Sequence, residues 1–245
     1  MTGLSIVIPM RNEAGNAGPL IDGILAACDG ADGLPQIEVI AVNDGSTDGT
    51  AAEVLALAAR DGRVRLLGHA VSAGQSAAIH SGVLAARGAL ICTLDGDGQN
   101  PPEEIPRLAS ALIAAAPGIA LVAGQRADRK DTQAKRIASK LANGIRSAAL
   151  DDGTRDTGCG LKAFRREAFL ALPYFNHMHR YLPALFTRDG WEILHLDVGH
   201  RPRGAGQSNY GNFGRALAGA SDLLGVMWLV RRRKTARATE ETTLP

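Results

Sequence analysis

The sequence predicts an α/β fold with a mostly parallel, doubly wound sheet flanked by helices. Short apolar runs alternate with helix-length segments from residue 4 to about residue 126, which is typical of a parallel sheet covered on both faces. Polar residues follow the apolar runs at four places: 9–13, 44–46, 95–99 and 124–126. Because ligands bind outside the carboxyl ends of the strands in such sheets, these places predict one shared site.

The elements follow in order from the apolar runs and the turn residues between them. Strands are expected at 4–9, 37–42, 64–67, 89–94 and 119–123, with helices ending near residues 28, 60, 87 and 116. The pattern changes after residue 126. A basic amphipathic helix is expected at 129–150, a Gly-rich loop at 151–160, a strand at 191–198, a polar loop at 200–211 and an apolar helix at 213–230.

Composition limits the class of protein. The 245 residues are 45% hydrophobic and 21% charged, which suits one large domain or one domain with an appendage. A formal net charge of +2 gives no general indication of nucleic-acid binding. Cys28, Cys92 and Cys159 have neither disulfide nor metal spacing, so a reducing cytoplasm is expected. We expect no signal peptide and no spanning helix, because no apolar run reaches roughly 18 residues.

The segment at 94–102 carries the strongest chemical signal. Asp95 and Asp97 follow an apolar strand, and Gly96 and Gly98 allow the backbone to fold both carboxylates to one side. Gln99 adds a third oxygen, and this set suits Mg²⁺ or Mn²⁺ with substrate phosphates completing the shell. An ordinary Asp-Gly turn is the alternative. The position at a strand end favours the metal site.

Asp44 also follows a strand. Its carboxylate is a candidate acceptor for hydrogen bonds from a nucleotide base or ribose. The alternative is that it caps the helix that follows. Because Asp48 and Thr50 stand closer to that helix, they are the better candidates for the cap.

Basic residues predict a place for phosphate. Arg126, Lys135, Arg136 and Ser139 are candidates, because Arg gives bidentate contacts to phosphate oxygens. A solvated helix face is the alternative. The segment at 200–211, with Arg203, predicts a flexible anion-binding loop, against the alternative of an ordinary surface loop. Five histidines lack ligand spacing and are expected to be structural: His69, His80, His177, His179 and His195.

The apolar segment at 213–230 is expected to be an interfacial helix. Asp222 interrupts it, and the uncharged run at 223–230 is too short to span a bilayer. The basic cluster at 231–234 fits anionic lipid headgroups. A core helix is the alternative. The expected division is therefore a catalytic-type domain at 1–211, a membrane-interface segment at 212–234 and a disordered tail at 235–245.

Three of these segments resemble family 2 glycosyltransferases of the GT-A fold: 5–13, 42–50 and 94–102. The resemblance covers roughly residues 4–210. The branch that it most resembles is the polyprenyl-phosphate glycosyltransferases, similar to dolichol-phosphate mannose synthase. Four segments carry the resemblance to this branch: 95–102, 135–139, 156–162 and 203–208. The chain departs from relatives at Cys159, where Ser is frequent, and at Asn209, where Lys is common.

The resemblance implies a nucleotide sugar as donor, with UDP preferred and a guanine nucleotide still open. It implies contacts to the base and ribose around Pro9, Glu13 and Asp44, and a metal on Asp95, Asp97 and Gln99. Phosphates would be held by Arg126, Lys135 or Arg136, Ser139 and Arg203. The donor site is further expected to include Asn12, Gly74, Gln75 and Ser208.

The expected reaction is inverting transfer of the sugar to polyprenyl phosphate, giving a lipid-linked donor for modifying cell-envelope glycans or lipids. Because a phosphate oxygen is already anionic, this reaction needs no strong base, whereas a hydroxyl acceptor would need one, with Asp156 as the candidate. Two alternatives remain: a cytoplasmic family 2 enzyme acting on a saccharide or lipid hydroxyl, and a non-catalytic nucleotide-sugar-binding protein. We expect peripheral attachment to the cytoplasmic face of the inner membrane, no nucleic acid, and possible homo-oligomers.

Overall fold

The computed structural model describes residues 3–126, 144, 146, 150, 152–201 and 212–232. Within these residues, seven strands form one sheet in the order β3-β2-β1-β4-β6-β5-β7. The strands are β1 (Leu4–Met10), β2 (Ile37–Asp44), β3 (Val64–His69), β4 (Leu90–Thr93), β5 (Ile119–Arg126), β6 (Lys162–Arg165) and β7 (Glu192–Val198). The helices are α1 (Ala17–Asp29), α2 (Thr50–Arg60), α3 (Gln75–Ala85), α4 (Glu104–Ala114), α6 (Arg166–Leu170), the 3-10 turn η1 (Met178–Arg180), α7 (Leu182–Arg188) and α8 (Asn212–Val230).

The sheet is mostly parallel, as the sequence predicts. β1 pairs in parallel with β2 and β4, β2 with β3, and β5 with β7. The exception is β6, which runs antiparallel between β4 and β5. This strand was not predicted, because its four residues are too few to show a hydrophobic period. Its insertion carries Lys162 to the carboxyl end of β4, opposite Thr93.

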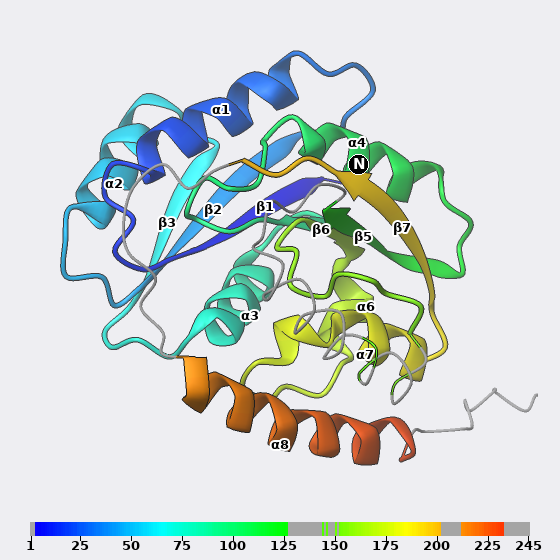
Figure 1. The fold of residues 1–245 in the computed structure, drawn as a ribbon. Coiled ribbons are helices and arrows are strands. Elements are labelled where there is room, and N and C mark those ends of the chain that lie inside the picture. The colour runs from blue at the N-terminus through cyan, green and yellow to red at the C-terminus, as the bar shows by residue number, and fades with distance from the viewer. Residues whose placement is uncertain are drawn as a thin grey trace, which may run out of the picture.

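Helices cover both faces of the sheet. Figure 1 shows α1, α2 and α4 over one face and α3, α6 and α7 over the other. Alternate residues of a strand point to opposite faces. In β1, Ile6 and Ile8 therefore join the core under α1 and α4, whereas Val7 packs in the core under α3 and α7. This alternation makes a three-layer core and leaves the carboxyl ends of the parallel strands at one edge.

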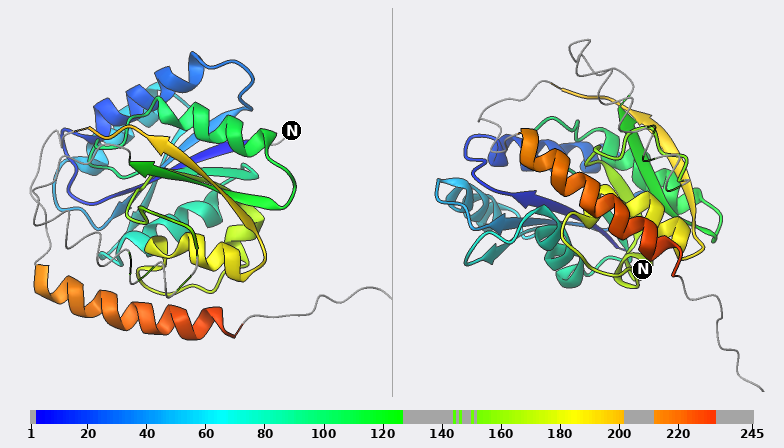
Figure 2. Two further views of the ribbon diagram at one scale, coloured as in Figure 1. Left: turned by 45° about the vertical axis from the view of Figure 1, so that its right-hand side comes forward. Right: turned by 60° about the horizontal axis from the view of Figure 1, so that its bottom comes forward.

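The last helix, α8, lies along the outer side of the layer that contains α3, α6 and α7 (Figures 1 and 2). Val226 is buried, and Leu223, Met227, Leu229 and Val230 pack against the second core. Three contacts hold the helix: Tyr181 to the Gly219 carbonyl, His177 to Asp222, and Arg188 to the Leu229 carbonyl. One side of α8 is thus part of the folded domain.

The opposite side of α8 is exposed. Leu224 is 68% exposed and Trp228 is 60% exposed, and the Arg232 guanidinium lies over the Trp228 ring. Of the helices that the structure describes, none combines the length and the apolar character needed to cross a bilayer. The interfacial role of this helix and the boundary at residue 212 stay predictions, and the predicted tail lies outside the described residues.

Candidate active site

The loop after β4 folds back on itself. The Asp95 amide donates to the Asn100 side chain at 2.9 Å, and the Gln99 amide donates to Asp97 Oδ1 at 3.1 Å. Gly98 adopts a φ of 73°, a conformation that glycine takes without strain. These bonds place the Asp95 and Asp97 carboxylates together at the carboxyl end of β4. The role of the Gln99 side chain as a metal ligand stays a prediction.

The Asp95 carboxylate sits in a tight, partly buried place. Gln75 Nε2 donates to Asp95 Oδ1 at 2.8 Å, and the Gly160 backbone lies against the same carboxylate. Burial, with the charge of Asp97, raises the pKa of Asp95 to about 6, although Lys162 and Arg126 lower it. The two nearby cations therefore do not fully compensate the acidic pair.

This charge imbalance fits a divalent cation. Two carboxylates with substrate phosphates are a usual set for Mg²⁺ and Mn²⁺. In the described part of the chain, no group of three or more His, Cys, Asp or Glu side chains could hold a metal by itself. Asp95 and Asp97 would thus supply part of a shell that a substrate diphosphate completes.

Gly160 provides a sharp test of this arrangement. A Cβ atom at residue 160 would lie 2.6 Å from Asp95 Oδ1, closer than side chains approach one another. Gly160→Ala is expected to displace the carboxylate and lower both metal affinity and transfer at least about tenfold, because ligand geometry is lost. Isothermal titration with Mn²⁺ would measure the affinity. Gly68→Ala is the control, since a Cβ there meets nothing within 4 Å; equal behaviour of the two variants would contradict the arrangement.

An ion pair stands beside the loop after β4, residues 94–102, which we call the acidic loop. Arg126, the last residue of β5, donates from Nε to Asp156 Oδ2 at 2.6 Å and from Nη2 to Oδ1 at 2.8 Å. Both side chains are largely buried. This bidentate pair fixes the guanidinium in one orientation. Asp156 is therefore engaged with a cation, which weakens it as a base.

Lys162 is a buried cation that the sequence analysis did not identify. It is 4% exposed at the start of β6 and donates to the Cys159 carbonyl. Burial lowers its pKa, while the charges of Asp95 and Asp156 raise it. The signal in the sequence was a Lys two residues after Gly160, but only the antiparallel pairing of β6 brings it to the carboxyl end of β4.

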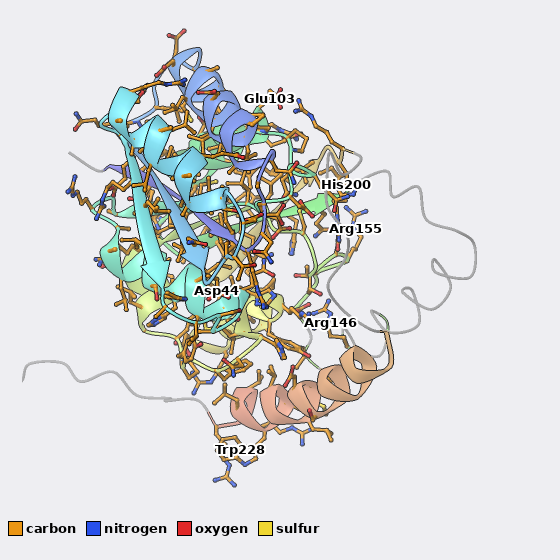
Figure 3. All side chains as sticks on the ribbon, turned by 90° about the vertical axis from the view of Figure 1, so that its left-hand side faces the viewer. Asp44, Glu103, Arg146, Arg155, His200 and Trp228 are labelled. Carbon is orange, nitrogen blue, oxygen red and sulfur yellow. The ribbon has the colours of Figure 1, made fainter. Side chains whose placement is uncertain are left out.

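Arg146, in the segment expected to be a basic amphipathic helix, is also buried. Its guanidinium contacts the Asp152 carboxylate and the Thr154 carbonyl. Thr154 Oγ1 bonds in turn to His195 Nε2 at 2.9 Å, and Arg155 reaches Asp197 at 2.7 Å. Figure 3 shows where Arg146 and Arg155 lie on the fold. These contacts hold the loop that carries Asp156 against β7.

Asp44, labelled in Figure 3, anchors a loop. Its two oxygens accept from the Ser72 hydroxyl at 2.7 Å, from the amides of Ala73 and Gly74 at 2.8 and 2.9 Å, and contact His69 Nδ1 at 2.7 Å. A carboxylate has about four acceptor positions, and all are engaged. Direct contact with a base stays a prediction, whereas the observed role is to hold Gly74 and Gln75 in place.

This anchoring predicts a pH-dependent effect of Asp44→Asn. Burial would raise the pKa of Asp44, but the four hydrogen bonds outweigh it and lower the pKa to about 2. The charged form therefore stabilises the fold by about 2 kcal/mol above the unfolded pKa, and this contribution is lost as the pH falls through about 2. Urea unfolding should show a deficit in Asp44→Asn at pH 7 that shrinks on acidification. Exposed Asp32→Asn is the control; a deficit independent of pH would contradict the prediction.

The ends of β1 and β2 are joined by side-chain bonds. Asn12, at φ 55°, accepts from the Thr47 amide at 2.9 Å, and the Glu13 amide donates to Thr50 Oγ1 at 2.8 Å. Asp48 accepts from the Thr50 amide at the start of α2, although the N-cap residue is Gly49 and makes no side-chain cap hydrogen bond. A Cβ at Gly96 would lie 2.9 Å from the Pro9 carbonyl. The predicted donor residues at 9–13 thus adjoin the acidic loop.

The polar loop expected at 200–211 begins against the acidic loop. The Arg201 amide donates to the Gln99 carbonyl at 2.9 Å, and its side chain reaches Glu103 at 2.6 Å. The structure therefore brings together Pro9, Glu13, Gln75, Asp95, Asp97, Arg126 and Asp156. Asp44 and Gly74 support the loop before α3, and Asn12 bonds to Thr47 after β2. Five predicted residues lie outside the described residues: Lys135, Arg136, Ser139, Arg203 and Ser208.

Comparison with known proteins agrees with this arrangement. One similar solved structure is glucosyl-3-phosphoglycerate synthase from Mycobacterium tuberculosis in complex with Mn²⁺, UDP-glucose and glycerol 3-phosphate. The match covers 94% of this chain and 80% of the chain of the synthase. The TM-score is 0.71 at 20% sequence identity, a likeness that shows the fold alone. The predicted GT-A architecture is thereby confirmed.

Sequence relatives are closer. Undecaprenyl-phosphate 4-deoxy-4-formamido-L-arabinose transferase from Aeromonas hydrophila is 38% identical over 210 residues, or 85% of this chain and 63% of the relative. Dodecaprenyl-phosphate galacturonate synthase from Rhizobium johnstonii is 34% identical over 232 residues, or 93% of this chain and 67% of the relative. The chain thus spans about two thirds of their length. The family model for glycosyl transferase family 2 matches residues 5–172, and the chain belongs to that family.

Proposed function

We propose that this protein transfers a sugar from a nucleoside diphosphate sugar, a UDP-sugar by preference, to the phosphate of a polyprenyl lipid. The observation that carries the proposal is the Arg126–Asp156 pair. A carboxylate held bidentate by Arg is a poor general base, and a phosphate acceptor needs none. The names of the relatives, undecaprenyl-phosphate and dodecaprenyl-phosphate enzymes, support the same acceptor.

The proposed mechanism is a direct, inverting displacement. A divalent metal bound at Asp95 and Asp97 would act as a Lewis acid that neutralises the departing diphosphate. Gln75 and the Gly160 backbone orient Asp95, and Asp44 holds the loop that carries Gln75. Arg126 would attract an anionic phosphate oxygen and hold it in line with the sugar carbon.

Transfer assays with a panel of substrates test this proposal. The purified protein is incubated with UDP- and GDP-sugars and either polyprenyl phosphate or the matching polyprenol. Transfer is expected only to the phosphate and only before treatment with EDTA, with recovery on adding Mg²⁺ or Mn²⁺. A product on polyprenol or on a saccharide hydroxyl would contradict the acceptor, and a product that survives EDTA would contradict the metal.

We further propose that the exposed side of α8 attaches the protein to a membrane surface, at the cytoplasmic face of the inner membrane. Leu224 and Trp228 lie one helical turn apart and are exposed, with Arg231 and Arg232 also exposed just beyond. Apolar side chains followed by cations are typical of interfacial helices on anionic lipid. The acceptor lipid would be reached from that surface.

Vesicle sedimentation tests this attachment. The full chain is expected to bind vesicles of phosphatidylglycerol and phosphatidylcholine better than vesicles of phosphatidylcholine alone. Replacing Leu224 and Trp228 together by Ser should reduce binding about tenfold or more, because these two large apolar side chains no longer enter the interface. Leu55→Ser, at another exposed apolar residue, is the control. Unchanged sedimentation of the double variant would contradict attachment through α8.

A further inference from the structure

His179 and Ser76 form a hydrogen-bonded pair between η1 and the first turn of α3. The Ser76 hydroxyl lies 2.7 Å from His179 Nδ1, and the His179 backbone amide donates to the same hydroxyl oxygen at 3.3 Å. Ser76 is 4% exposed. The residues are 103 positions apart in sequence, so the sequence alone gave no reason to connect them.

The hydrogen bonds at Ser76 bear on the tautomer of the imidazole. The Ser76 oxygen accepts the backbone amide hydrogen of His179, and its own hydrogen points to His179 Nδ1 in the tautomer that carries the ring hydrogen on Nε2. Burial lowers the pKa of His179 to about 3, helped by the charges of Arg180 and Lys162. The ring therefore stays neutral in the physiological range.

The Nε2 hydrogen is available to a ligand. Within the described part of the chain, Nε2 of His179 has no protein partner. It also differs from the buried atoms Arg146 Nε and His200 Nδ1, because solvent reaches it. Ser76 directly follows Gln75, whose side chain bonds to Asp95. Lys162 acts electrostatically on both His179 and Asp95. The imidazole is thus held against the same first turn of α3 whose Gln75 bonds to Asp95.

The segment that carries His179 is held in an uncommon conformation. His177, just before η1, has a backbone φ of 68°, which residues other than Gly seldom adopt. Such strain persists only where surrounding contacts maintain it. Here the contacts are the His177–Asp222 pair to α8 and the Ser76–His179 pair to α3. These two contacts hold the segment that carries His179 between α8 and α3.

We propose that His179 is a substrate-contacting residue, whose neutral imidazole donates its Nε2 hydrogen to an oxygen of the substrates bound beside Asp95, and that Ser76 is its positioning residue. The inference rests on the proposed sugar transfer. The oxygen belongs either to a hydroxyl of the donor sugar or to the acceptor phosphate. Both are hydrogen-bond acceptors, and the experiment separates them.

The first experiment measures the tautomer by NMR of protein labelled with ¹⁵N-histidine, with His179→Gln used to assign the signal. The expected signal is a neutral ring with hydrogen on Nε2, unchanged from pH 8 to pH 5. Ser76→Ala should shift the ring toward a mixture of tautomers. A ring that is charged at pH 7 or carries hydrogen on Nδ1 would overturn the proposal. This measurement does not depend on any enzymatic activity.

The second experiment compares His179→Ala with His179→Gln, whose amide keeps an N–H donor. The alanine variant is expected to lose about 10- to 100-fold in kcat/KM, the size of a hydrogen bond to a polar or charged oxygen, and the glutamine variant should recover most of it. Weaker binding of UDP-glucose with unchanged binding of UDP would identify the donor sugar. A raised KM for polyprenyl phosphate alone would identify the acceptor.

Two outcomes would overturn the inference. One is a glutamine variant as impaired as the alanine variant with a matching fall in Tm, which would indicate a purely structural residue. The other is an alanine variant with unchanged binding and transfer. If the wild-type protein glycosylates no polyprenyl phosphate, the proposed function fails, while UDP-glucose binding and the tautomer still test His179 separately.

Discussion

Replacing Asp95 by Asn is expected to abolish sugar transfer while leaving the metal-free protein at least as stable as the wild type. The asparagine can still accept from Gln75, so the loop keeps its shape. It cannot supply the negative charge that attracts a divalent cation. Loss of a metal ligand beside a departing diphosphate is expected to lower kcat by at least about 1000-fold.

Asp95→Asn is expected to raise the free energy of unfolding of the metal-free protein at pH 7. Because burial and Asp97 raise the pKa of Asp95 to about 6, the charged carboxylate destabilises the metal-free fold above that pH. Asp95→Asn removes up to about 3 kcal/mol of this cost at pH 7. The advantage should vanish as the pH falls below the unfolded pKa of about 4, where the carboxyl is protonated in both states.

Two measurements check this prediction. Urea unfolding without metal should show Asp95→Asn equal to or above the wild type at pH 7, and Mn²⁺ should stabilise only the wild type. Exposed Asp32→Asn should respond to Mn²⁺ like the wild type. If Asp95→Asn kept full transfer, or still bound Mn²⁺ with wild-type affinity, the metal would have to be placed elsewhere.

The sequence predicted those features that depend on neighbours along the chain. The five strands β1 to β5 appear as apolar runs with turn residues after them, and each expected strand overlaps an observed one. The acidic loop could be placed for the same reason, since Asp95 and Asp97 directly follow β4. Local pattern thus located the candidate site before any packing was known.

Features that depend on distant contacts could not be predicted. In the sequence Asp44 is a carboxylate at the end of a strand, available to a ligand. In the structure both of its oxygens bind residues near 72–74, about 30 positions away. The burial of Lys162 depends on β6, which inserts between β4 and β5. His179 has no ligand spacing, and its meaning comes from Ser76 alone. In each case the contacts of a polar side chain come from a distant part of the chain.

Arg126 and Asp156 are expected to act as a unit, with Arg126 making the larger contribution. Arg126→Lys keeps the charge but loses the bidentate contact to Asp156, and should lower kcat/KM for polyprenyl phosphate about 10- to 100-fold. Arg126→Ala leaves the buried Asp156 carboxylate without its cation, and this is expected to destabilise the fold by about 3–5 kcal/mol. The lysine variant therefore gives the cleaner measure of transfer.

The double variant decides which role Asp156 has. If Asp156 acts through Arg126, Asp156→Asn lowers transfer about tenfold by loosening the guanidinium, and adding it to Arg126→Lys costs little more, because coupled residues are not additive. If Asp156 were the general base, Asp156→Asn alone would abolish transfer, and activity would fall at acidic pH as the carboxylate is protonated. Arg60→Ala, which breaks an exposed pair with Asp22, should change nothing, because such surface pairs contribute at most about 1 kcal/mol. Measurable transfer by Asp156→Asn, coupled to the Arg126 effect, is the result that a phosphate acceptor requires.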